Sequence, residues 1–277
     1  IFINKDLLNL VNLDEPTTPK QTIEEFEEEL EEELKELENI NFDEIVKEDD
    51  YESLSISDLT GIEAFTSLGG LHCNDNNIAT IDISANTLLQ VLQCNQNQIS
   101  SISAVNNPLL SAIYCHSNLL TGLDFSSNPD LQYIRCYNNQ ITNLTLPQSA
   151  ILEELIASDN NLTAIDVTFN TGLTLIELEQ NQLASIDLTQ NTLLEDLYLR
   201  NNLFTSLDCS NNSSLDWIVV NDNPNIESIN VANGNNTNFG FFRAHNSPNL
   251  TCIQVDDVDY SNTNWLGTSF MFDAASS

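Results

Sequence analysis

Residues 68–86 read LGGLHCNDNNIATIDISAN, and most of the chain repeats this stretch. A leucine recurs every 21 residues, at Leu68, Leu89, Leu110, Leu131, Leu152, Leu173, Leu194 and Leu215. An asparagine stands eight residues after each of them, at Asn76, Asn97, Asn118, Asn139, Asn160, Asn181, Asn202 and Asn223. A single globular core would not impose this spacing. A solenoid would, because each repeat must offer its neighbour the same side chain at the same height.

One unit follows the pattern L-x-x-L-x-C-x-x-N-x-I-x-x-I-D-I-x-x-N. This pattern resembles the leucine-rich repeat family in its short bacterial form. The resemblance implies a curved, β-rich solenoid whose short strands pair in parallel on the concave face, with the asparagine bonding backbone groups in the turn. A second asparagine column, 18 residues after each leading leucine, is broken at Ser149 in the repeat that contains Pro147. We interpret both columns as structural, since asparagine can satisfy turn backbone groups.

The alternation of side chains along a strand assigns the two faces of each repeat. Residues three and five positions after the leading leucine share one face, and those at offsets two, four and six share the other. The first face is apolar and forms the core. The second face, with offset seven at its margin, is therefore predicted to be the open, concave surface.

The sequence divides into four predicted segments: an N-terminal segment at 1–20, an acidic helical cap at 21–53, repeats at 54–255 and a C-terminal cap at 256–277. Thr22 and Glu25 have the spacing of a capping box, and apolar residues then recur every three or four positions. The favoured interpretation is a helix that covers the open end of the solenoid. A partner-binding helix and a loosely tethered acidic segment are the alternatives.

The charge of the chain excludes some classes of partner. The formal net charge of −35 over 277 residues would repel nucleic acid and anionic membrane surfaces. No apolar run approaches the ~18 residues of a transmembrane helix. No signal peptide is visible and the chain begins with Ile1, which we interpret as a processed or truncated product.

Four cysteines occupy the same inward offset of successive repeats: Cys73, Cys94, Cys115 and Cys136. Later repeats place alanine, leucine or valine there, so we predict a buried ladder of free thiols. Disulfides and a metal site are the alternatives, although a zinc site needs ligands that converge on one point. For Cys252 the resemblance implies a second cysteine near the chain end. Because none follows before Ser277, this thiol is either free or paired beyond the sequence.

Cations and aromatic rings gather at the open-face offsets. All three arginines and all three histidines fall there, and the repeats contain no lysine. Two patches are predicted, because neighbouring strands lie ~4.8 Å apart. The first patch is Tyr114, His116, Tyr133, Arg135 and Tyr137, and the second patch is Tyr198, Arg200, Trp217, Phe241, Arg243 and His245. Aromatic and arginine side chains anchor interfaces, so both patches are candidate ligand-binding sites. The alternative is that strands favour aromatic residues and that arginine offsets local acid.

Catalysis and metal binding have weaker support in the sequence. Glu177 and Glu179 share a face at roughly 6–7 Å, a separation that glycosidases use. The open face offers nothing obvious to raise either pKa, and Arg200 should keep both ionised, so hydrolysis remains a remote alternative. His72 and His116 lie about 10 Å apart, too far for one zinc ion. No cofactor is expected, with calcium at Asp256, Asp257 and Asp259 as the alternative to a solvated acidic turn.

The entry segment at 54–68 and the final unit resemble those of internalin-like surface proteins of Bacteroidetes such as flavobacteria. The resemblance implies a non-enzymatic protein at the extracellular or outer-membrane surface of a Gram-negative bacterium. Its expected ligand is a protein, peptide or polysaccharide on the concave face. The alternative is a structural accessory subunit of an outer-membrane uptake or secretion assembly.

Overall fold

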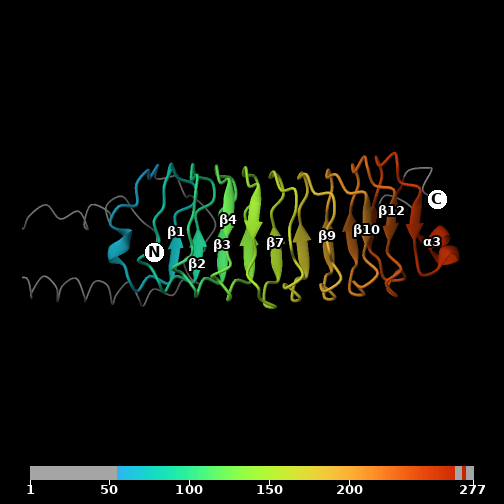
Figure 1. Cartoon of the computed structure of the whole chain (residues 1–277), viewed down its shortest axis with the longest axis horizontal. Helices are drawn as coiled ribbons and strands as arrows, with labels where there is room; N and C mark the ends of the chain where they lie inside the picture. The colour runs from blue at the N-terminus through green and yellow to red at the C-terminus, as the bar shows by residue number, and fades with distance from the viewer. Residues whose placement is uncertain (1–54, 266–269, 273–277) are drawn as a thin grey trace, which may run out of the picture.

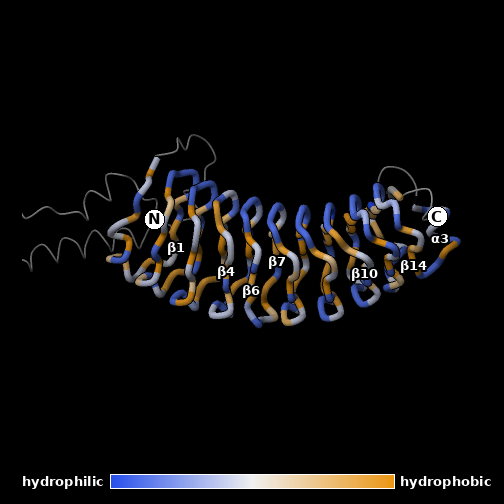
Figure 2. Tube along the Cα trace, turned by 45° about the horizontal axis from the view of Figure 1, so that its top comes forward, coloured by the Kyte–Doolittle hydropathy of each residue, from blue (hydrophilic) through white to orange (hydrophobic). Residues whose placement is uncertain are grey.

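The computed structural model describes residues 55–265 and 270–272, so the acidic helix predicted over 21–53 lies outside the described residues. The chain coils into a solenoid whose turns stack side by side from one end to the other (Figure 1) and which bows gently along its length (Figure 2). The predicted parallel-strand solenoid is thereby confirmed. Within the described ranges, no helix has the length and apolar character needed to cross a membrane.

One strand from each turn joins a ten-stranded sheet in which every pair is parallel. In spatial order its strands are β1 (Gly70–His72), β2 (Val91–Gln93), β3 (Ala112–Tyr114), β5 (Tyr133–Arg135), β7 (Glu154–Ile156), β8 (Leu175–Glu177), β9 (Asp196–Tyr198), β11 (Trp217–Val219), β13 (Phe241–Arg243) and β15 (Phe270–Met271). The register is constant, with the first residue of each strand opposite the first residue of the next from β1 through β13.

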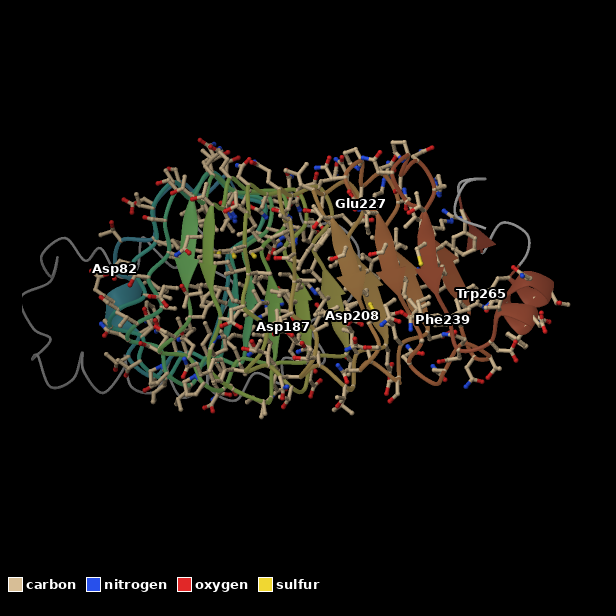
Figure 3. All side chains as sticks on the ribbon, turned by 45° about the vertical axis from the view of Figure 1, so that its right-hand side comes forward. Asp82, Asp187, Asp208, Glu227, Phe239 and Trp265 are labelled. Carbon is tan, nitrogen blue, oxygen red and sulfur yellow. The ribbon has the colours of Figure 1, made fainter. Side chains whose placement is uncertain are left out.

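The opposite side of each coil is mostly extended chain, with short parallel pairings in two places. One two-stranded sheet and one three-stranded sheet form there, from β4 (Gly122–Asp124), β6 (Asn143–Thr145), β10 (Ser206–Asp208), β12 (Ser228–Asn230) and β14 (Cys252–Gln254). Exposed aspartates such as Asp82, Asp187 and Asp208 (Figure 3) occupy this side, and each accepts a hydrogen bond from the backbone N–H two residues later. None of the predicted ligand-binding residues lies on these strands.

Side-chain alternation produces the core. In β2, Leu92 is fully buried while the residues on either side of it are partly exposed. Leucines, isoleucines and thiols from successive turns form one continuous apolar core. Figure 2 shows how apolar and polar residues alternate along the trace of each turn. Burying each leucine contributes roughly 1.5–3 kcal/mol relative to exposure, so stability accumulates turn by turn.

The asparagine at offset eight links each turn to the one before it. The Asn118 Oδ1 accepts a hydrogen bond from the Ile99 N–H at 2.9 Å, and its Nδ2 donates to the carbonyls of Cys94 and Cys115 at 3.0 and 3.1 Å. The residue just before this asparagine is left-handed in every regular turn, as at Ser117 with φ 56°. The residue types at that position are aspartate, asparagine, glutamine and serine. None of them is β-branched, and β-branched residues adopt a positive φ least readily.

The second asparagine column is also structural. The Asn107 Nδ2 donates to the carbonyls of Ile83 and Asn86 at 3.0 and 2.8 Å. Asn233, 18 residues after Leu215, continues the column into the longer unit by donating to the Asn212 carbonyl at 2.8 Å. These bonds satisfy turn carbonyls that would otherwise be buried without donors.

The predicted ladder of free thiols is confirmed. Cys73, Cys94, Cys115 and Cys136 are buried and unpaired, as is Cys209, whereas Cys252 is exposed on β14. Burial raises the pKa of the Cys73 and Cys136 thiols to about 12, so both stay protonated at neutral pH and act as small apolar side chains.

Aromatic residues close the C-terminal end of the solenoid. Trp265 packs edge-on against Phe239 and Phe242, with ring centroids 5.7 Å away in both cases (Figure 3). The short helix α3 (Val258–Asn264) delivers this tryptophan, and Asp257 caps the helix by accepting from the Tyr260 N–H at 2.9 Å. The apolar core therefore ends under a cover rather than at an open turn.

Candidate ligand-binding face

The register of the ten-stranded sheet brings the predicted residues together on its outer face, which we call the sheet face. It comprises the residues at offsets two, four, six and seven. Tyr114 lies opposite Arg135, and Trp217 lies opposite Phe241. Tyr198 and Arg243 flank the same residue, Val219, from the two neighbouring strands. All three arginines therefore belong to one surface, as the sequence predicts.

The first patch is pre-assembled by ring contacts. His116 stacks on Tyr137 with ring centroids 4.2 Å apart and planes 7° apart. The Arg135 guanidinium lies over the Tyr114 ring, 5.4 Å from its centroid. Burial and Arg135 lower the pKa of His116, which therefore stays neutral at physiological pH. Tyr133 stands at the margin and donates its hydroxyl to Glu153 at 3.1 Å.

The second patch is a continuous stack on neighbouring strands. The Trp217 ring packs face to face with the Phe241 ring, with centroids 4.0 Å apart and planes 8° apart. The Arg243 guanidinium lies over Phe241 at 4.4 Å from its centroid. Tyr198 is partly buried beside this stack. Burial raises the pKa of its hydroxyl, and the nearby acids raise it further. His245 completes the patch at offset six, half-buried.

Two acidic partners of the arginines escaped prediction. Arg135 forms a bidentate ion pair with Glu154, at 2.5 and 3.0 Å, and Arg200 pairs with Asp222 at 3.1 Å. Each acid lies in the repeat that follows its arginine, at a different offset. The sequence could therefore have predicted these ion pairs if diagonal neighbours on adjacent strands had been considered as well as directly opposite ones. The alternative that arginine offsets local acid is thus correct for these two residues, although it does not account for the stacked rings.

The sheet face is acidic despite its arginines. Seven carboxylates occupy its offsets, against three guanidinium groups: Asp75, Glu154, Asp159, Glu177, Glu179, Asp196 and Asp222. Five of these lie in the repeats between Arg135 and the Trp217 stack. The sequence argument emphasised the scarce cations and overlooked this majority of acids.

The structure changes the expectation for the carboxyls of Glu177 and Glu179. We expected Arg200 to keep both ionised, but burial raises the pKa of both carboxyls, and mutual repulsion adds to the effect at Glu179. The Ser158 hydroxyl donates to Glu177 at 3.2 Å and accepts from the Glu179 N–H at 2.9 Å. Both pKa values move in the same direction, so these shifts do not by themselves assign one carboxyl as acid and the other as base.

Two of the three acids proposed for calcium bond backbone N–H groups. Asp256 accepts from the Gly234 N–H at 3.0 Å and from the Asn236 N–H at 3.2 Å, while Asp257 caps α3. Asp259 lies in the first turn of that helix and is exposed. Within 55–265 and 270–272 no three histidine, cysteine or acidic side chains are grouped to hold a metal ion. Calcium at this turn stays a prediction.

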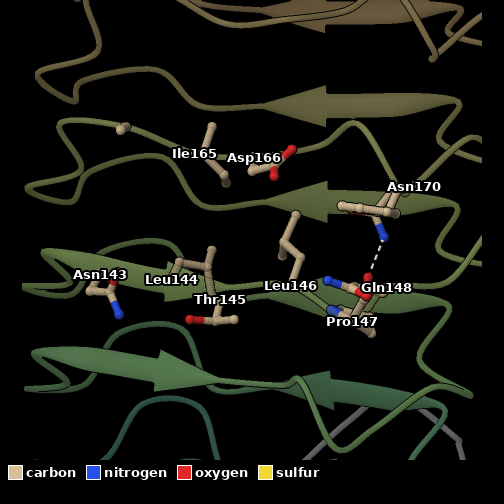
Figure 4. A pocket seen from close by; sticks show the side chains of 11 residues that line it. Asn143, Leu144, Thr145, Leu146, Pro147, Gln148, Ile165, Asp166 and Asn170 are labelled. Atoms are coloured by element: carbon tan, nitrogen blue, oxygen red, sulfur yellow. Dashed lines mark hydrogen bonds between the residues drawn. The ribbon is translucent and has the colours of Figure 1, made fainter.

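A cavity of about 380 Å³ opens on the side away from the sheet face (Figure 4). It lies between residues 143–148 and the following turn at 164–170, where Asn170 bonds the Pro147 carbonyl at 2.8 Å. The proline and Ser149 interrupt the regular turn here. The cavity is therefore a consequence of an irregular repeat and shares no residue with either patch.

Comparison with known proteins gives structural neighbours only. The sequence matches no family model and no curated protein. The functional domain of InlJ from Listeria monocytogenes, which includes a cysteine ladder, is 30% identical with a TM-score of 0.63 over 80% of this chain and 52% of that domain. The internalin InlF of the same species is 20% identical over 81% of this chain and 66% of its own, with a TM-score of 0.59.

A plant peptide hormone receptor, RGFR1 in complex with RGF2, is 18% identical with a TM-score of 0.56, over 70% of this chain and 37% of the receptor chain. At that identity the likeness is one of fold alone, as it is for InlF. The chain spans about half of the InlJ domain, at 52% of its length. These neighbours are repeat proteins of internalin and receptor type, and none is described as an enzyme.

Proposed function

We propose that this chain, a leucine-rich repeat protein, is a non-enzymatic binding protein that takes a protein or peptide partner on its sheet face. The observation that carries the proposal is the stack of Trp217, Phe241 and Arg243, which is held together by contacts within the chain. Rigid aromatic area presented without rearrangement lowers the entropy cost of binding, and tryptophan and arginine dominate measured interface energies. The fold of the plant receptor RGFR1 in complex with RGF2 supports the choice.

A polypeptide fits the face better than an anionic polysaccharide. Arg135 and Arg200 are already engaged with Glu154 and Asp222, so an acidic sugar would have to displace these carboxylates. The remaining acids of the face would also repel it. A polypeptide can instead place apolar side chains on the rings and basic side chains beside the acids.

We further propose that binding takes place at the surface of a Gram-negative bacterium, on the strength of the resemblance of the entry and final units to surface proteins. A role as an accessory subunit of an outer-membrane assembly is a variant of this proposal. Deletion of residues 1–50 distinguishes the two: loss of the assembly from an otherwise folded protein would identify that segment as the docking element.

Selection from a phage-displayed library of random 12-residue peptides on the full chain tests the proposal. Trp217→Ala should weaken the selected peptides at least tenfold, because the ring is a central anchor. Phe169→Ala is the matched control, since Phe169 is 53% exposed in a turn away from the sheet face. Circular dichroism should show both variants folded.

Either of two outcomes overturns the proposal. Peptides could bind Trp217→Ala and Phe169→Ala as tightly as the parent chain, which would place the site elsewhere. Alternatively, no peptide could be enriched while a panel of acidic polysaccharides binds in a Trp217-dependent manner, which would replace the polypeptide by a glycan.

A further inference from the structure

We infer that the second patch contains a slot for a guanidinium group of the partner, formed by the Asp196 carboxylate and the open face of the Trp217 ring. This inference deepens the proposed function and rests on it. It assigns the partner a chemical character, a basic polypeptide with an arginine at its centre. We call this place the cation slot.

The strand register defines the wall of the slot. β11 pairs with β13 on one side, where Trp217 lies opposite Phe241, and with β9 on the other, where Trp217 lies opposite Asp196. Because the Trp217 and Phe241 rings are stacked with planes 8° apart, one face of the tryptophan is covered by Phe241. Its other face must turn toward β9, above Asp196.

Among the described residues, the acid of the slot has no side-chain partner. Arg135 pairs with Glu154 and Arg200 with Asp222, whereas the Asp196 carboxylate has neither an ion pair nor a hydrogen bond to any residue of 55–265 and 270–272. Burial raises the pKa of Asp196, and repulsion by Asp216 and Glu195 adds to this effect. A cation beside Asp196 would offset the cost of burying its charge and would counter the repulsion.

Elsewhere on the sheet face, the chain combines a ring, a guanidinium group and a carboxylate from its own residues. In the first patch, the Arg135 guanidinium lies over the Tyr114 ring and forms its bidentate pair with Glu154. In the second patch, Arg243 covers Phe241 but the Trp217 face toward β9 has no guanidinium of the chain opposite it. An incoming arginine would complete there the combination of ring, cation and carboxylate seen in the first patch.

Arginine suits the slot better than other groups. Its planar guanidinium can lie flat on an indole while its N–H groups donate to a carboxylate. An apolar side chain would cover the Asp196 carboxylate without replacing its lost water contacts, and a neutral donor would bond it without offsetting its charge. The slot therefore selects for charge as well as for shape.

Titration with N-acetyl-arginine amide, followed by the indole ¹⁵N–¹H signals, tests the slot directly. The chain has two tryptophans, so each signal can be assigned by substitution. The Trp217 signal should move with arginine amide, and at least tenfold less at equal concentration with N-acetyl-citrulline amide, which is neutral and nearly isosteric. Trp265 is an internal reference, because its buried indole donates to the Asn236 carbonyl.

Asp196→Asn should abolish the arginine-dependent shift, while Asp130→Asn, which removes an exposed acid in a distant turn, should preserve it. Equal shifts with the citrulline compound, or an unchanged response of Asp196→Asn, would overturn the slot. The slot can fail while the proposed function holds. This would be so if library peptides depend on Trp217 but show no enrichment in arginine and bind Asp196→Asn as tightly as the parent chain.

Discussion

At the scale of single residues, the asparagine at offset eight determines whether a turn can close. The amide of Asn160 donates to the carbonyls of Cys136 and Ala157, each at 3.1 Å, and accepts from the Ile141 N–H at 2.9 Å. All of these groups are buried. An aspartate would lose the donors and a leucine would lose every bond, so the repeat tolerates little else here.

Asn160→Ala should lower the free energy of unfolding by about 2–4 kcal/mol, because several buried backbone groups lose their partner at once. Urea denaturation of the parent and the variant measures the difference. Asn161→Ala is the control, since Asn161 is the next residue in the chain and is exposed. Similar losses for the two variants would contradict a structural role of the column.

The raised pKa of Glu179 gives a prediction with a defined sign. Its carboxyl binds a proton more readily in the folded chain than in the unfolded one, so its charge destabilises the fold above the ordinary pKa and ceases to do so as pH falls below it. Glu179→Gln should therefore raise stability at pH 7, by at most about 1 kcal/mol because solvent screens a half-exposed group.

Thermal unfolding at pH 7 and below pH 4 measures this effect, and the difference between Glu179→Gln and the parent should vanish at the lower pH. Glu227→Gln provides the control for loss of one exposed negative charge (Figure 3). A Glu179→Gln variant that is less stable than the parent at pH 7 would show that this carboxylate stabilises the fold.

At the scale of elements, the turn that contains Pro147 constrains the one after it. Gly172 has no room for a side chain, because a Cβ there would lie 2.1 Å from the Ala150 carbonyl oxygen. In four other repeats an exposed leucine or isoleucine occupies this offset, at Leu88, Leu109, Ile151 and Leu193. The irregular turn has therefore moved backbone into the space that a side chain would occupy.

Gly172→Ala should destabilise the chain by about 1–3 kcal/mol, since the two turns must separate to admit a methyl group. In Gly69→Ala the added Cβ meets nothing within 4 Å, and this variant is the matched control. Chemical denaturation compares them. Equal denaturation midpoints for the two variants would show that the Pro147 turn can move to admit the methyl group without loss of stability.

Strands, core and turns could be predicted because they repeat. A leucine such as Leu92 is buried in every turn, so the 21-residue spacing alone specifies the register, the thiol ladder and both asparagine columns. Interruptions carry no such signal. The crowding at Gly172 does not follow from the pattern, since it depends on how one unusual turn packs on its neighbour.

The candidate site was predictable in composition but not in pairing. Offsets placed Trp217 and Phe241 on one face, and the register confirms it. The ion pair of Arg135 with Glu154 links different offsets of neighbouring repeats, so it depends on side-chain direction as well as on strand position. The acidic character of the face, in contrast, could be counted from the offsets, where seven carboxylates stand against three arginines.

At the scale of the whole molecule, the charge of −35 opposes folding into a narrow stack. Screening shortens from ~10 Å at 0.1 M salt to ~3 Å at 1 M, so added sodium chloride should raise the melting temperature of the full chain. Differential scanning calorimetry in 0.1 and 1 M sodium chloride measures this, with uncharged sucrose as the control for nonspecific effects. A melting temperature that falls with salt would imply that ion pairs outweigh self-repulsion.

The central claim is that partners bind on the sheet face and not on the opposite side of the coil. A photo-reactive benzoylphenylalanine in place of Tyr198 on β9 or of Ser228 on β12 reports on the two sides directly, with a Trp217-dependent library peptide as the probe. We predict cross-linking from position 198 and none from position 228. Cross-linking from position 228 alone would contradict the account.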